Sequence, residues 1–207
     1  MRATLISLFL VLLVAGGCGL FDIRSPVAPP TGAKNVPRAN PTDPESTLVN
    51  VETSVRCRTP GLPLYEESLA AAYRLVLDQA DALQLGTGVT ELDKAADTGA
   101  QRILSGAAAD SFAFVWDRSR GDFSIEPSGD NGFLYRNIEY LIQFVRQEGD
   151  SLIVNSSLLV RGVADITIRE DDSGNWVFEQ WNDGRLPNPA ANQKTFGLWH
   201  AEAAVGS

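Results

Sequence analysis

The sequence predicts an α+β domain in which N-terminal helices pack on a strongly curved antiparallel sheet. Apolar residues follow helical spacing early in the domain and alternate with period two after Ser111. The longest alternating stretch is Leu152–Ile168, which is typical of a strand with one face on a core. Straight, it would span roughly 50 Å, whereas a compact domain of this size measures about 35–40 Å across. The strand must therefore bend, and Gly162, its only inward position without a side chain, is the predicted bend.

The first residues of the chain have the pattern of an export signal. Arg2 is followed by the apolar run Leu5–Val14, which is too short to span a bilayer, and then by Ala15, Gly16, Gly17 and Cys18. The Ala-Gly-Gly-Cys sequence resembles the lipobox of bacterial lipoproteins. The resemblance implies a signal peptide over residues 1–17, a lipid on Cys18, and attachment to a membrane by that lipid. The expected location is the bacterial cell envelope, with the outer membrane preferred because Gly19 replaces the Asp that favours inner-membrane retention.

A proline-rich tether follows the lipidated cysteine. Six of the chain's eleven prolines lie between Phe21 and Glu45, with few large apolar residues among them. This composition favours extended conformations over a packed core. We therefore expect Cys18 and the tether to occupy residues 18–41 and the folded domain to occupy residues 42–207.

Helix signals dominate the start of the domain. Asp43 and Pro44 predict a capped helix that ends before Thr59, and a second short helix begins near Pro63. Residues 69–83 fit an amphipathic helix by spacing, yet Tyr73, Leu75 and Leu77 also alternate as a strand. Thr90 and Asp93 resemble a capping box, which predicts a helix with an inner face of Leu92, Ala96 and Ile103.

Strand signals follow. Alternating residues predict one strand near 112–116 and another near 138–144, and Asp171–Asn175 is a turn that leads out of the long strand. Trp176 and Phe178 point the same way, but Trp181 is out of phase with them. A bulge near Glu179 and Gln180 is therefore expected, because it would re-aim Trp181. A last short strand is predicted at Phe196–Trp199.

The segment Gly174–Asp183 carries a family resemblance, together with Tyr65–Leu69, Arg161–Ile166 and Phe196–Trp199. This layout looks like bacterial lipoproteins of the nuclear transport factor 2-like superfamily. The resemblance implies a sheet wrapped around helices as a cone, and it implies a strand at Tyr73–Asp78. That superfamily hosts unrelated functions, so the fold alone assigns none.

The candidate chemistry is sparse. A net charge of −9 without a basic stripe argues against nucleic acid as a partner, and the sequence predicts no metal and no cofactor. The only histidine, His200, is expected to be partly exposed at a strand end. Asp165 is expected on the polar face of the long strand, and Asp183 is expected to form a backbone hydrogen bond in a turn. Cys57 is expected to be a buried apolar group in the first helix; the alternatives are a reactive thiol and an intermolecular disulfide.

Two functional readings remain. The preferred one is a non-catalytic envelope lipoprotein that binds an unknown protein or a small apolar ligand; the predicted pocket residues are Tyr140, Trp116, Trp176, Trp181 and Trp199. The alternative is a small-molecule isomerase or dehydratase of the ketosteroid-isomerase type. It requires a carboxylate with a raised pKa near a Tyr hydroxyl, with Asp78 or Asp117 beside Tyr140. A purely structural protein with a filled cone is a third hypothesis.

Overall fold

The computed structural model describes residues 36–106, 111–148 and 151–206. The helices are α2 (Pro44–Arg56), the 3₁₀ helix η2 (Thr59–Gly61), α3 (Leu62–Glu67), α4 (Gln79–Leu85), α5 (Lys94–Gly106) and α6 (Phe196–Val205). The strands are β1 (Leu69–Val76), β2 (Glu91–Asp93), β3 (Ser111–Asp117), β4 (Ser124–Pro127), β5 (Gly132–Glu148), β6 (Ser151–Glu170), β7 (Trp176–Gly184) and β8 (Gln193–Lys194). The predicted signal peptide and Cys18 lie outside the described residues.

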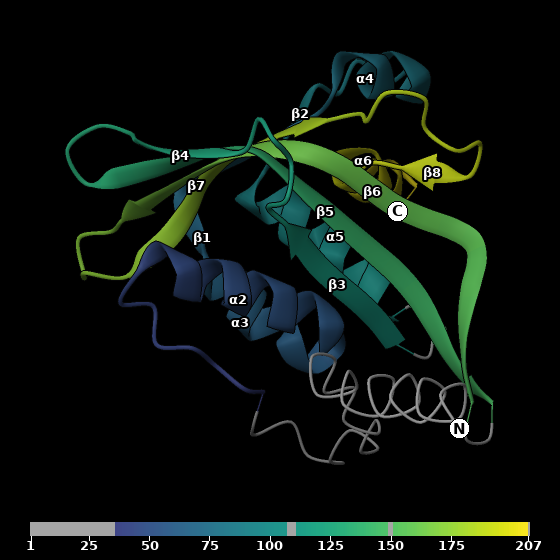
Figure 1. The fold of residues 1–207 in the computed structure, drawn as a ribbon, viewed down its shortest axis with the longest axis horizontal. Coiled ribbons are helices and arrows are strands. Elements are labelled where there is room, and N and C mark those ends of the chain that lie inside the picture. The colour runs from purple at the N-terminus through teal and green to yellow at the C-terminus, as the bar shows by residue number, and fades with distance from the viewer. Residues whose placement is uncertain (1–35, 107–110, 149–150, 207) are drawn as a thin grey trace, which may run out of the picture. The chain divides into compact units, whose positions relative to one another are not determined.

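All the described strands join one curved sheet in the order β2-β1-β7-β6-β5-β3, and β4 and β8 pair with β5 and β6. Figure 1 shows the long strands β5 and β6 curving over the helices. Helix α2 packs on β3, β6 and β7, while α5 contacts β1 and α6 contacts β6. The sheet was predicted to be purely antiparallel, and this prediction is wrong for two pairs of strands. β1 runs parallel to β7, and β8 runs parallel to β6.

The long strand is confirmed as β6, but its interruption does not lie at Gly162. Gln143 of β5 pairs with Leu159, and the next residue, Phe144, pairs with Asn155. Residues 156–158 therefore have no partner in β5, and Figure 1 shows β6 bending sharply before it crosses the molecule. The pairing of Gly162 with Tyr140 is regular. A bulge needs extra residues and not a particular side chain, so the glycine was a poor guide to the bend.

The predicted bulge in β7 is confirmed. Thr167 of β6 pairs with Gln180, whereas Ile168 pairs with Phe178, so Glu179 is the extra residue. The bulge turns Trp181 toward the core, where its side chain is only 1% exposed. A second bulge lies in β5, where Asn137 has a φ of 54° and donates its backbone N–H to Asp165 Oδ1 at 2.9 Å. Asp165 is thus a half-buried partner of that bulge.

The N-terminal helices follow their capping signals. Asp43 caps α2 by accepting from the Ser46 N–H at 2.8 Å. The helix predicted from Thr90 is wrong at its start, since residues 91–93 form β2 against β1 and Asp93 caps α5 by accepting from Ala96. Ile103, predicted on the inner face, is 45% exposed.

The segment 69–83, which fitted both structures, is a strand followed by a helix. β1 ends at Val76, and Asp78 caps α4 by accepting from the Ala80 N–H at 2.8 Å. Helical spacing was misleading here because the alternating residues Tyr73, Leu75 and Leu77 are the ones that face the core. Among the described helices, none has the length and hydropathy of a bilayer-spanning segment.

The predicted last strand at Phe196–Trp199 is wrong, because these residues open helix α6. Thr195 caps the helix by accepting from the Leu198 N–H at 3.2 Å. Every residue from Phe196 to Ala201 is buried. A helix that is apolar on all sides has no periodicity that a sequence pattern can reveal.

Replacing Gly162 with alanine should destabilise the fold. An added Cβ would lie 2.3 Å from the Tyr140 hydroxyl and 2.7 Å from the Gly184 carbonyl oxygen, so both must move. We expect a loss of about 1–3 kcal/mol in the free energy of unfolding, measured by urea denaturation. Gly99→Ala in α5 is the matched control, since its Cβ would meet nothing within 4 Å. An equal effect of the two substitutions would contradict this account.

Candidate functional site

The interior of the cone is occupied by aromatic side chains. Trp181 and Phe196 are stacked, with ring centroids 4.4 Å apart and planes 10° apart. Tyr140 packs edge-on against Trp181 at 5.4 Å, and Trp116 contacts both of these rings. Trp199 joins the cluster through Phe196 at 6.4 Å. Four of the five predicted pocket residues thus lie together and fill the space between sheet and helices.

Trp176, the fifth predicted pocket residue, lies elsewhere. It sits at the start of β7, where its ring contacts Phe133 at 5.6 Å. Its side chain is half-buried and borders a surface pocket of about 260 Å³ whose lining includes Arg38 and Glu67. Sequence alternation gave Trp176 an inward direction, but it could not reveal that this part of β7 lies at the end of the sheet.

Three buried carboxylates hold the N-terminal part of α6. Asp81 accepts from the Thr195 hydroxyl at 2.6 Å, Asp183 accepts from the Gly197 N–H at 2.6 Å, and Asp97 Oδ1 lies 2.6 Å from His200 Nδ1. The three acids come from α4, β7 and α5. Because each one needs a hydrogen-bonding partner inside the protein, together they fix the position of the helix.

Asp183 forms the most connected of these contacts. Its Oδ1 accepts from the Tyr140 hydroxyl at 2.6 Å and from Trp181 Nε1 at 3.3 Å, while its Oδ2 accepts from Gly197. Burial raises the pKa of Asp183 to about 6 even though its hydrogen bonds act in the opposite direction. Burial, together with the charge of Asp183, also raises the pKa of Tyr140 well above its usual value.

Tyr140 completes the connection to α6. Its hydroxyl accepts from the Phe196 N–H at 2.8 Å while it donates to Asp183. Gly162 and Gly197 make room for these groups, because a Cβ on Gly197 would lie 2.9 Å from Asp183 Oδ2. The pair links β5, β7 and α6, and both oxygens of Asp183 are already engaged.

The carboxylate beside Tyr140 is therefore not one of the two predicted from the sequence. Asp78 caps α4, and Asp117 is exposed and accepts from the Ser119 N–H at 2.8 Å. Asp183 does bond a backbone N–H, as expected, but that group belongs to α6 and not to a turn. The signal that could have identified it was its spacing, since Asp183 lies two residues after Trp181 on the same face of a strand.

His200 is not partly exposed, as predicted, but completely buried. The prediction assumed a strand end, whereas α6 carries the ring into the core against Phe196 at a centroid distance of 4.0 Å. Asp97, its partner, also accepts from the Tyr65 hydroxyl at 2.6 Å. Within the described part of the chain, His200 Nε2 and the Tyr73 hydroxyl are buried without a hydrogen-bonding partner.

Cys57 is half-buried at the C-terminal end of α2. Burial raises the pKa of the thiol, and this effect outweighs the opposing charge of Arg56. The pKa of the thiol therefore stays above its usual value despite Arg56, and the apolar interpretation of Cys57 fits its surroundings better than the reactive one.

The chain matches no known family profile and no curated protein. Solved structures do resemble it. One is a protein of unknown function from Mycobacterium tuberculosis, with a TM-score of 0.50 and 10% identity over 78% of this chain and 84% of that one. Another is an NTF-2-like protein of unknown function from Pseudomonas aeruginosa, with a TM-score of 0.47 and 14% identity over 69% and 94% of the two chains. A ketosteroid isomerase-like protein from Erwinia carotovora gives a TM-score of 0.43 and 9% identity over 70% and 94%.

At these identities the likeness concerns the fold alone. The sheet curved around early helices agrees with it. The predicted α+β fold, with N-terminal helices packed on a curved sheet, is confirmed.

The raised pKa of Asp183 predicts a specific pH dependence of stability. In the folded state the pKa is about 6, and in the unfolded chain it is about 3.9. Between these values the folded protein binds the extra proton, so the contribution of Asp183 to stability is full below about pH 4 and is lost as the pH rises through 6. The expected loss is about 3 kcal/mol.

Asp183→Asn removes this titration. In urea unfolding at several pH values, the difference in stability between the wild type and this variant should shrink by that amount from about pH 4 to about pH 7. Asp117→Asn is the control on an exposed carboxylate. A constant difference across this range would show that Asp183 does not titrate as described.

Proposed function

We propose that this protein is a lipid-anchored component of the bacterial cell envelope whose domain acts by binding a partner on its surface and does not catalyse a reaction. The observation that carries the proposal is the filling of the cone by α6. In a fold of this kind a ligand needs the space between sheet and helices, and here Phe196, Trp199 and His200 occupy it. The proposal therefore places recognition on the outside of the domain.

The interior polar groups support the same proposal. Asp81 accepts from Thr195 and from Arg185, and Asp183 has donors on both oxygens. A buried carboxylate with its donors in place stabilises a fixed structure, and removal of one donor leaves an unpaired buried group. These acids are thus better suited to hold a helix than to receive a substrate.

The lipid anchor is the second part of the proposal. It rests on the leader and on Cys18 at the cleavage point. Contacts of the N-terminal segment with the domain include the ion pair of Arg38 with Glu67 and the bond from the Ala39 N–H to Asn50 Oδ1 at 2.8 Å. The proline-rich residues before these contacts would link the lipid to the domain as an extended spacer.

The anchor is tested by replacing the cysteine. When the chain is expressed in a bacterium that processes lipoproteins, Cys18→Ser should abolish incorporation of labelled fatty acid and release the protein from the membrane fraction. Cys57→Ser is the matched control and should retain both. Mass spectrometry of the N-terminal peptide identifies the modified residue. Labelling that persists without Cys18 would remove the anchor from the proposal.

The isomerase or dehydratase alternative has one observation in its favour. A carboxylate with a raised pKa lies 2.6 Å from a Tyr hydroxyl in the interior, which is the arrangement that a proton-transferring site needs. It also requires α6 to leave the cone, because Gly197 and Phe196 donate to these same two groups. The filled interior makes this the second candidate.

A turnover assay separates the two candidates. We expect the full chain to isomerise a β,γ-unsaturated ketone no faster than the Asp183→Asn variant does, because no proton acceptor in the cone is accessible to the substrate. Asp117→Asn serves as the control variant. If the wild type and Asp117→Asn both turned over the ketone and Asp183→Asn did not, the enzymatic function would be established instead.

A further inference from the structure

One end of the concave face of the sheet is not covered by a helix. Ile125 pairs with Tyr135, and Pro127 pairs with Phe133, which in turn pairs with Ile168. Opposite residues in a sheet point to the same face, and Tyr135 and Ile168 are buried in the core. The side chains of Ile125, Pro127 and Phe133 therefore point to the concave side, where Phe133 contacts Trp176. We call these four residues the rim patch.

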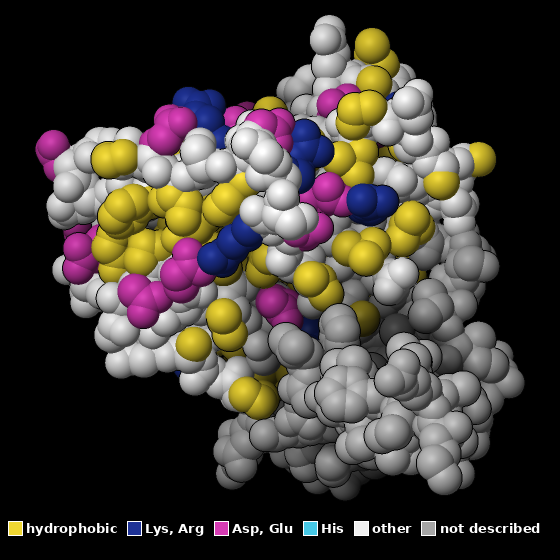
Figure 2. Space-filling model, in the orientation of Figure 1, with side chains coloured by type: hydrophobic (Ala, Val, Ile, Leu, Met, Phe, Trp, Pro, Cys, Tyr) yellow, Lys and Arg dark blue, Asp and Glu magenta, His cyan; other side chains and the backbone are white. Residues whose placement is uncertain are grey.

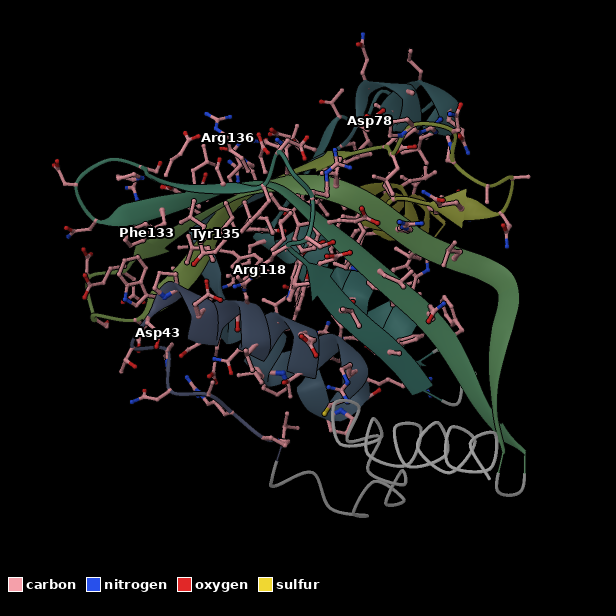
Figure 3. The ribbon with its side chains drawn as sticks, in the orientation of Figure 1. Asp43, Asp78, Arg118, Phe133, Tyr135 and Arg136 are labelled. Atoms are coloured by element: carbon pink, nitrogen blue, oxygen red, sulfur yellow. The ribbon has the colours of Figure 1, made fainter. Side chains whose placement is uncertain are left out.

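The rim patch remains accessible because the part of the sheet that α2 covers ends beside it. The first turn of α2 reaches Tyr135, whose hydroxyl donates to Glu45 at 2.8 Å, and Thr47 donates to the Trp176 carbonyl at 2.8 Å. Beyond this border Ile125 is 45% exposed, Pro127 is exposed, and the two aromatic rings are half-buried. Figure 3 shows Phe133 and Tyr135 above Asp43 at this end of the molecule.

Acidic side chains surround the rim patch. Asp130 lies in the turn between β4 and β5, while Asp171 and Asp172 lie in the turn between β6 and β7. The two turns are adjacent, because the Glu170 N–H donates to the Asn131 carbonyl at 3.0 Å. Asp43 lies at the start of α2, on the opposite border. Figure 2 shows the hydrophobic patch at this end with acidic side chains around it.

These acids are not neutralised within the described part of the chain, where Asp43, Asp130, Asp171 and Asp172 form no ion pair. Two cations border the patch, and each has an acidic partner of its own. Arg118 is paired with Glu45 and lies over the Tyr135 ring, while Arg38, which lines a pocket with Trp176 and Asp171, is paired with Glu67. Several acids elsewhere on the sheet are paired, as in Glu139 with Arg161 and Glu179 with Arg169. This rim thus combines an apolar patch with negative charge that no ion pair among the described residues compensates.

From this arrangement we infer that the rim patch docks a protein segment that presents an apolar side chain between lysine or arginine residues. The apolar side chain would pack on Ile125, Phe133 and Trp176, and the cations would pair with Asp130, Asp172 and Asp43. An anionic membrane surface carries the wrong charge for this rim. The inference rests on the proposed function, because it names the class of partner for a surface-binding protein.

The probe is a synthetic peptide with one phenylalanine between two Lys-Arg pairs. Its binding to the full-length chain in a non-ionic detergent is measured by fluorescence anisotropy, and the contact is located by amide chemical-shift changes. We expect binding that weakens steeply with added salt, with shifts centred on residues 125–133 and 171–176. Peptides with glutamate in place of the cations, or with glycine in place of phenylalanine, should bind at least about tenfold more weakly.

The variants separate charge from apolar contact. Asp130→Asn with Asp172→Asn, and separately Ile125→Ser, should each weaken binding by about tenfold. These exposed side chains have no structural role in the described contacts, whereas Asp171 is left unchanged because it accepts from the Ser173 and Asn175 N–H groups. The matched controls are Glu91→Gln on β2 and Leu83→Ser on α4, which lie away from the rim and should have no effect.

Equal binding of the three peptides, or of the rim variants and controls, would overturn the inference. So would binding of the unlipidated Cys18→Ser chain to phosphatidylglycerol vesicles that is lost in Ile125→Ser, because the rim would then contact lipid. Lipidation and ketone turnover are measured on the same preparation. A lipidated, inactive chain that ignores the peptide therefore refutes only this inference, whereas turnover or absent lipidation refutes the proposed function itself.

Discussion

The structure depends on one buried carboxylate. Asp183 lies in the core of the cone, where an unpaired negative charge would be prohibitively unfavourable. Its oxygens can be satisfied only if Tyr140, Trp181 and Gly197 surround it, and these residues come from β5, β7 and α6. Each element must therefore reach its final position for any of them to be stable. The carboxylate thus couples the two sides of the sheet to the last helix of the domain.

The same principle repeats along the start of α6. Thr195, Gly197 and His200 each contact a different buried acid, so that six consecutive positions of the chain carry three anchoring contacts. Aromatic packing adds to this, since Phe196 stacks on Trp181 between those contacts. Polar bonds give the helix its register, and apolar burial supplies most of its favourable free energy. A helix held in this way is part of the core, and the cone has an interior filled by its own chain.

The sequence predicted those features that depend on local or periodic patterns. The cap of Asp43, the long strand β6 and the bulge at Glu179 can each be recognised from the sequence around them. It did not predict α6, because uniform burial removes the periodicity that distinguishes a helix from a strand. The errors at His200 and Asp183 follow from that one, since both side chains take their environment from α6. Their partners, Asp97 and Tyr140, lie far away in the chain, and no spacing rule connects them.

The interior and the rim of the domain differ in how their acidic side chains are paired. In the interior, Asp81, Asp97 and Asp183 each accept a hydrogen bond from the protein itself. This leaves these acids little capacity to bind a ligand. At the rim, Asp130 and Asp172 keep their charge beside apolar side chains that no helix covers. An exposed acid is well solvated by water, so it costs the fold almost nothing to leave it unpaired there. Beside an apolar surface, however, the same charge selects which molecules can come close, because it repels anions and attracts cations before contact. In the proposed binding function the rim would therefore carry the selectivity, while the buried acids hold α6 in the core.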